Sequence, residues 1–238
     1  MGRPSAFIAT LAVLAAAAVQ AASAATVTFV SDTTWAVSDP AKTFLGSAQN
    51  VCLDASAPAN CPAGATLYGY HGGGWTVDLS SIPGATWIWA PGVTGATSPA
   101  FPSEFSFSKT FDLPGKATAG TISVMAVDDM AEVFVNDTSV GTAGSVTNAS
   151  VAAAAQSSLA TFDIASFLVA GTNVVTVVAA NGPFGCDAGP YSCNPAGLVF
   201  GGSVQATLLA EPDTYAMMVT GLGLLVFILR RRGRLPHA

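Results

Sequence analysis

The sequence predicts an all-β body, either a sandwich or a barrel, between two apolar chain ends. Three observations support this fold class. Short segments rich in β-branched and aromatic residues recur along the body, turn-forming Gly, Pro and Asn separate them, and several segments alternate apolar with polar residues. Helical periodicity is almost absent, since only residues 152–159 have the composition of a helix and no convincing N-terminal cap precedes them.

The first 24 residues have the three parts of a secretory signal peptide. Arg3 provides a positive start, residues 7–19 form an almost unbroken apolar run, and residues 22–24 read Ala-Ser-Ala, which matches an A-x-A cleavage site. An N-terminal transmembrane anchor is the alternative, but the apolar run is too short to favour it. We expect cleavage after this site, which leaves residues 25–209 as an exported body.

The other end of the chain has the pattern of a short transmembrane helix followed by a basic stop. Residues 215–229 carry no charge, and four arginines stand within the next five residues. As a helix this span would reach about 22 Å, against about 30 Å for a bilayer core, so the arginine stems would have to cover the difference. A core helix of a soluble domain is the alternative, but it does not explain the arginines, which favour the cytoplasmic side.

The residues around this span come in a specific order. Glu211-Pro212 and Thr214-Tyr215-Ala216 stand before or at its start, Gly221–Leu225 lies within it, and the arginines follow. Residues 210–234 thus resemble a PEP-CTERM sorting signal, although Ala210 replaces the usual first proline and Asp213 a common serine. The motif residues are Glu211, Pro212, Thr214, Tyr215, Arg230, Arg231 and Arg232.

The resemblance to a PEP-CTERM signal implies a route through the cell envelope. It implies a Gram-negative, polysaccharide-making host and an exosortase-type processing enzyme as partner. The chain would be held transiently in the inner membrane with its body in the periplasm, and would then reach the cell surface or the extracellular matrix. The resemblance says nothing about the body itself.

The body is strongly acidic. Residues 25–209 contain three lysines and twelve carboxylates, a net charge of −9, because the other basic residues lie in the two chain ends. Such a surface repels phosphate backbones, so nucleic acid is excluded as an expected partner. Calcium ions or neutral glycans suit this charge better.

Four cysteines lie in the body as two close pairs. Three pairings are possible, and we favour the two local ones, Cys52 with Cys61 and Cys186 with Cys193. Each local pair encloses a short loop rich in Pro, Gly, Asn and Asp, with few apolar residues of its own. A zinc site is the weaker alternative, because neither pair has C-x-x-C spacing and His71 is the only histidine outside the tail.

Eight strands are expected in the body. The clearest is the segment 105–112, in which Phe105, Phe107, Lys109 and Phe111 share one register while small polar residues occupy the other. Asn136-Asp137 predicts a hairpin turn, because these residues tolerate positive φ. In chain order the expected strands are 26–30, 85–89, 105–112, 121–127, 131–135, 161–164, 173–180 and 198–209.

The segment 85–89 is also a candidate binding element. Trp87 and Trp89 share one face of the expected strand and Ile88 takes the other. The two tryptophans belong either to the core or to an aromatic platform for a sugar ring, beside a loop of Pro, Gly and Thr. Tyr191, in the loop of the second cysteine pair, is a further candidate ligand contact.

The segment from Phe105 to Phe200 resembles the galactose-binding-like jelly roll of carbohydrate-binding modules. The resemblance rests on the order of several short motifs: Phe107-Ser108-Lys109-Thr110-Phe111, Asp128-Asp129, Val133-Phe134-Val135-Asn136, Phe162-Asp163-Ile164, Leu168, Gly171-Thr172-Asn173 and Asn194-Pro195-Ala196-Gly197-Leu198. It implies a jelly-roll β-sandwich and a structural Ca²⁺, for which Asp128 and Asp129 are the candidate ligands. Solvated turn aspartates are the alternative.

The residues favour a binding protein over an enzyme. His71 is the only histidine available as a general base, and no nucleophile elbow or metal spacing accompanies it. The leading hypothesis is a non-catalytic surface protein whose body binds glycan, such as the host's own exopolysaccharide. The alternatives are a structural or adhesive surface protein without a ligand site, and a secreted polysaccharide hydrolase.

Overall fold

The structure is a computed structural model. It describes residues 24–54, 61–71, 75, 78–100, 102–127, 129–184, 186, 189–208 and 212–232, with the backbone alone at 126–127, 212–216 and 231–232. Residues 25–207 form one compact unit, and the two chain ends are grouped apart from it. All of the expected signal peptide except its last residue, Ala24, lies outside the described residues.

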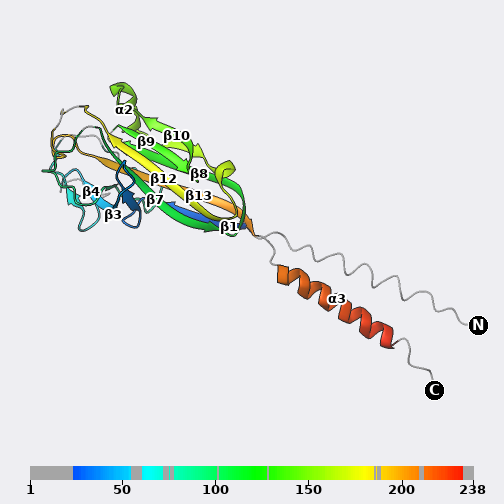
Figure 1. The fold of residues 1–238 in the computed structure, drawn as a ribbon. Helices are drawn as coiled ribbons and strands as arrows, with labels where there is room; N and C mark the ends of the chain where they lie inside the picture. The colour runs from blue at the N-terminus through cyan, green and yellow to red at the C-terminus, as the bar shows by residue number, and fades with distance from the viewer. Residues whose placement is uncertain are drawn as a thin grey trace, which may run out of the picture. The chain divides into compact units, whose positions relative to one another are not determined.

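The body is a β-sandwich of two sheets (Figure 1), so the predicted all-β sandwich is confirmed. The seven-stranded sheet has the order β11-β8-β13-β6-β4-β5, with β1 also paired to β13. Its strands are β1 (Ala24–Val30), β4 (Gln49–Cys52), β5 (Thr66–Leu67), β6 (Ile88–Trp89), β8 (Gly115–Val127), β11 (Ala160–Asp163) and β13 (Gly197–Leu208). The strand β13 is central, between β8 and β6.

The six-stranded sheet has the order β10-β9-β12-β7-β2-β3. Its strands are β2 (Ala36–Ser38), β3 (Phe44–Ser47), β7 (Ser103–Leu113), β9 (Met130–Val135), β10 (Thr138–Gly144) and β12 (Gly171–Asn181). The long pair β7 and β12 is antiparallel, with Phe107 opposite Val177. The predicted strands 105–112, 131–135 and 173–180 are therefore confirmed.

The core lies between the two sheets and follows from the alternation within their strands. In β12, Val175, Val177 and Ala179 are buried, and Phe107 of β7 lies among them. The facing sheet contributes buried residues such as Ile122, and all belong to one apolar cluster. Full burial of a Val, Ile or Phe side chain contributes about 1.5–3 kcal/mol of stability. The alternation of apolar and polar residues therefore determines which face of each strand turns inward.

The turn between β9 and β10 is the predicted hairpin. Asn136 and Asp137 have φ of 50° and 62°, the positive values that a two-residue hairpin turn requires at both positions. The amide of Asn136 also donates to the carbonyl of Phe167 and to Oδ1 of Asn173, both at 3.0 Å. The strand β10 was not predicted, because two glycines interrupt its sequence.

The only α-helix in the described part of the body begins earlier than the composition suggested. The helix α2 spans Ala149–Ala155, whereas we expected residues 152–159 and no convincing cap. Asn148 caps it, because its Oδ1 accepts from the backbone N–H groups of Ser150 and Val151 at 3.1 and 3.2 Å. The cap corrects the prediction and explains why the helix starts at residue 149.

Both local disulfides are present, as predicted. Cys52 is bonded to Cys61 and Cys186 to Cys193, with Cα–Cα distances of 5.7 and 5.8 Å. Two disulfides indicate an oxidising, exported compartment.

The C-terminal unit contains the helix α3 (Pro212–Arg232), which includes the expected span 215–229. Within the residues described, no helix reaches the length and hydropathy of a membrane span. Arg230, which belongs to the predicted sorting motif, is exposed on α3. Glu211 and the side chains of Pro212, Thr214, Tyr215, Arg231 and Arg232 lie outside the described part.

Candidate functional site

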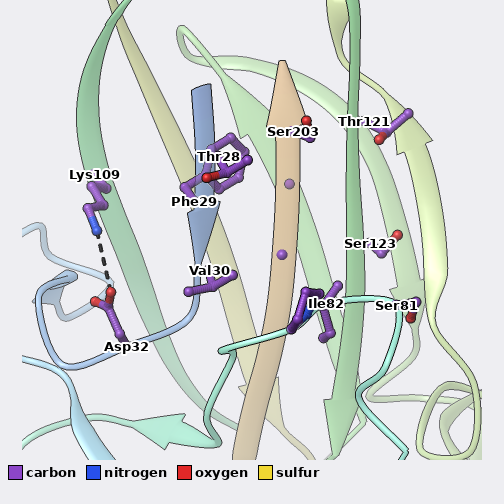
Figure 2. Close-up of a pocket in the computed structure, with 13 residues that line it drawn as sticks. Thr28, Phe29, Val30, Asp32, Ser81, Ile82, Lys109, Thr121, Ser123 and Ser203 are labelled. Carbon is purple, nitrogen blue, oxygen red and sulfur yellow. Dashed lines mark ion pairs between the residues drawn. The ribbon is translucent and has the colours of Figure 1, made fainter. Parts of the chain in front are cut away.

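A pocket of about 400 Å³ opens on the outer face of the seven-stranded sheet (Figure 2). Three strands, β1, β8 and β13, provide most of its lining, and the loop 81–83 covers one part. Within β8 the neighbouring residues Ile122 and Val124 turn into the core, so Thr121 and Ser123 face outward. Phe29 and Ile82 also line the pocket and belong to the apolar core cluster, so the pocket borders the core.

Two glycines of β13 form the floor of the pocket. A side chain at Gly201 would stand 2.7 Å from Cγ2 of Ile82, which packs on the outer side of the strand. A side chain at Gly202 would collide with the ring of Phe29 on the inner side. The glycine pair thus lets Ile82 and Phe29 pack closely on opposite sides of one strand.

Hydroxyl groups from separate strands line the pocket. Thr28 comes from β1, Thr121 and Ser123 from β8, and Ser203 from β13 (Figure 2). Ser123 shares a hydrogen bond of 2.8 Å with Thr161. In the described part of the chain, the hydroxyls of Thr28, Thr121 and Ser203 have no hydrogen-bond partner, so they are free to bind a polar ligand.

An ion pair closes one end of the pocket. Nζ of Lys109 lies 3.7 Å from Oδ2 of Asp32, and both side chains are about one-third exposed, at 33% and 37%. The same Nζ donates to Oγ1 of Thr34 at 2.7 Å and lies 5.6 Å from the centre of the Trp35 ring. An ion pair with this degree of exposure contributes little stability, so its main effect is to place one negative and one positive group beside the hydroxyls.

The three residues predicted to bind a sugar ring are in the core. Trp87, Trp89 and Tyr191 are 2%, 1% and 0% exposed. Nε1 of Trp89 donates to the hydroxyl of Tyr191 at 3.1 Å, and Trp75 packs on Trp87 with ring centres 4.7 Å apart. The expected aromatic platform is therefore corrected: these rings offer no face to a ligand, and the core alternative describes their position.

The physical reason lies in the place of β6. This strand is flanked by β13 and β4, and Ile88 is buried as completely as the tryptophans on either side of it. Both faces of the strand are covered, so the alternation that predicted one exposed side does not apply. The pocket itself was missed, because single Ser, Thr and Gly residues in distant strands leave no motif.

Asp129 is buried, with 1% of its surface exposed. Its Oδ2 accepts from the backbone N–H of Gly182 at 2.6 Å, and its Oδ1 accepts from Nε2 of Gln156 at 3.4 Å. Burial raises the pKa of this carboxyl to about 6, and the hydrogen bonds from Gly182 and Gln156 oppose part of that rise. Asp129 is thus not a solvated turn residue.

The expected calcium site has no described ligand set. Asp128 lies outside the described residues, and the described ones contain no group of three or more His, Cys, Asp or Glu side chains that could hold a metal. Each carboxylate oxygen of Asp129 accepts a hydrogen bond from an N–H group, of Gly182 or of Gln156. The structural calcium therefore stays a prediction.

No family model matches the chain, and no curated protein matches it. Among solved structures it is similar to an α-L-rhamnosidase from Streptomyces avermitilis, with 22% identity, a TM-score of 0.36 and coverage of 53% of this chain and 12% of that one. An FMN-binding β-glucuronidase from Facaelibacterium prausnitzii L2-6 has 15% identity, a TM-score of 0.35 and coverage of 75% and 23%.

An α-L-rhamnosidase from Aspergillus terreus has 16% identity, a TM-score of 0.33 and coverage of 49% and 15%. The chain spans less than a quarter of the length of each of these three enzymes. Likenesses this distant and partial carry no argument about the activity of this chain.

Proposed function

We propose that the body is an exported, non-catalytic module, a jelly roll of the galactose-binding-like kind, that binds glycan in the pocket on its outer face. One observation carries the proposal: hydroxyls from three strands converge on the pocket beside a carboxylate and an ammonium group. Such groups donate to and accept from sugar hydroxyls, and about 400 Å³ lies within the range of small-ligand sites.

The charged groups of the pocket favour binding over hydrolysis. Glycoside hydrolysis by the usual mechanism needs two carboxyl groups on opposite sides of the scissile bond. Among the described residues that line the pocket, Asp32 is the one carboxylate, and it is paired with Lys109. His71 does not line the pocket.

The experiment is calorimetric titration of the full chain with fragments of the host's exopolysaccharide, with calcium and with chelator. The double variant Thr28→Val/Thr121→Val removes two pocket hydroxyls and keeps β-branched side chains in both strands. We expect saturable binding by the wild type and a loss of about tenfold or more in the variant. Thr142→Val, at an exposed position of β10, is the matched control and should bind as the wild type does.

Equal binding by the double variant and the control would place the glycan elsewhere. The burial of Trp87 and Trp89 supports a second candidate, a structural or adhesive surface protein without a ligand site. Absence of binding by the wild type, with and without calcium, would favour that candidate. Loss of binding in the presence of chelator would indicate that glycan binding depends on a metal ion.

We also propose that the tail is a PEP-CTERM-type sorting signal, read by an exosortase-type enzyme of the inner membrane. The motif, the apolar span and the arginines support it, and the disulfides agree with export. The released protein should then lack everything beyond the region of Glu211. Intact mass of surface material that still includes the arginine tail would overturn this proposal.

A further inference from the structure

We infer that the pocket selects neutral glycans and discriminates against acidic ones, an inference that rests on the proposed glycan-binding function. Two of the described residues that line the pocket are charged, Asp32 and Lys109, and they neutralise each other. The other polar side chains of the lining are hydroxyls. A ligand carboxylate would therefore enter a pocket whose one positive group among the described residues, Lys109, is already paired with Asp32.

The ammonium group of Lys109 is already engaged on three sides. It pairs with Asp32, donates to Thr34 and lies over the ring of Trp35. Asp32 is held in turn, because its Oδ1 accepts from the backbone N–H of Thr34 at 2.8 Å and also from the Thr34 hydroxyl. To bind a ligand carboxylate, Lys109 would have to leave this arrangement and leave Asp32 unpaired.

A neutral sugar needs no such exchange. A carboxylate offers about four lone-pair positions, so Asp32 can accept from sugar hydroxyls and keep its bonds to Lys109 and Thr34. The free hydroxyls of Thr28, Thr121 and Ser203 can donate or accept as the ligand requires. The net charge of −9 on the body adds a long-range repulsion for polyanions that depends on salt.

The test uses matched pairs of oligosaccharides and the full chain. Oligogalacturonate, oligoglucuronate and oligomannuronate of six residues would each be compared with the same oligomer after carboxyl reduction, which keeps the linkage and removes the charge. At about 10 mM NaCl, where the Debye length is about 30 Å, we expect at least one reduced oligomer to bind tenfold or more tighter than its acidic parent. At about 1 M NaCl the difference should shrink but remain.

An acidic oligomer that binds as tightly as its reduced form, or more tightly, would overturn the inference and leave the proposed function intact. If no oligomer of either kind binds and the exopolysaccharide fragments also fail, the proposed function itself is wrong. If only the exopolysaccharide fragments bind, the same comparison is made with those fragments before and after carboxyl reduction. Tighter binding of the reduced fragments would support the inference, and equal or tighter binding of the acidic fragments would overturn it.

Two variants separate the pocket from the charge of the whole body. Asp32→Asn frees Lys109 while it keeps an acceptor for Thr34, so the preference for the reduced oligomer should fall about fivefold or more. Asp137→Asn removes the same charge from the exposed β9–β10 turn, where asparagine also tolerates the positive φ of 62°. It should leave the preference within about twofold. Equal effects of both variants would show that net charge, and not the pocket, sets the selectivity.

Discussion

The side chain of Asp129 and the backbone N–H of Gly182 are joined by a hydrogen bond of 2.6 Å. Asp129 precedes β9, Gly182 follows β12, and the same carboxylate accepts from Gln156 at the end of α2. One buried carboxylate therefore links three segments, and within the described part of the chain no cation pairs with it. Its protonation should affect how well these segments hold together.

We expect Asp129→Asn to flatten the pH dependence of stability between about pH 4 and 7. The pKa of Asp129 is raised to about 6 in the folded chain, so the folded state binds this proton more tightly than the unfolded state. The stabilisation by the proton is complete below about pH 4 and is lost as the pH rises through about 6, a change of about 3 kcal/mol. Asparagine can still accept from Gly182 and does not titrate.

Melting temperatures of the full chain at several pH values would check this prediction. Asp137→Asn is the control, because Asp137 is exposed in the hairpin turn. A variant at Asp129 that keeps the slope of the wild type between pH 4 and 7 would show that another group causes it.

Gly144→Ala should destabilise the body by more than about 2 kcal/mol. Gly144 has a φ of +82°, and a Cβ there would overlap the carbonyl oxygen of Asp129. Gly171 has nearly the same φ, +88°, with no atom within 4 Å of the added Cβ. Gly171→Ala should therefore lower the free energy of unfolding by only about 1 kcal/mol, which is the cost of a left-handed backbone conformation for alanine. Urea denaturation of both variants would measure the difference. Similar losses at both positions would mean that the contact with Asp129 does not matter.

Tyr191→Phe should cost about 1–3 kcal/mol of unfolding free energy. The Tyr191 hydroxyl accepts from Nε1 of Trp89 at 3.1 Å and lies 3.3 Å from Oγ of Ser103, all inside the core. The substitution leaves the buried indole N–H without this acceptor. Tyr70→Phe, at a half-buried position, is the control in the same denaturation experiment. A loss no larger than the control's would argue against the hydrogen bond.

Replacing both cysteines of the second disulfide by serine should lower stability by about 2–3 kcal/mol. The bridge between Cys186 and Cys193 closes a loop with a sequence separation of 7, and that loop contains Tyr191. Loss of the bridge gives this loop more freedom in the unfolded chain. Calorimetry of the oxidised wild type and the double variant would measure the difference, and unchanged stability would mean that core packing alone holds the loop.

The parts of the fold that the sequence predicted correctly are those with local causes. The alternation that places Phe107 inward lies within one strand, the β9–β10 turn depends on Asn136 and Asp137 alone, and each disulfide joins cysteines fewer than ten residues apart. The cap at Asn148 is also local. It was missed because no acidic or amide side chain stands at Val151 to complete a capping box.

The site could not be predicted, because its parts meet only through the pairing of strands. Thr28, Thr121 and Ser203 are each about 80 or more residues apart and come together since β1 and β8 both pair with β13. The burial of Trp89 depends on strands on both sides of β6 and on Tyr191, far along the chain. The hydrogen bond from Gly182 to Asp129 is likewise nonlocal.

The central place of β13 also determines how the body responds to tension. This strand ends at Leu208, where the body passes into the C-terminal segment, and it is hydrogen-bonded to β8, β6 and β1. A pull on the chain beyond Leu208 therefore reaches an interior strand instead of an edge strand. The strand can leave the sheet only if bonds to three neighbours break, so the mechanical load is spread over the seven-stranded sheet.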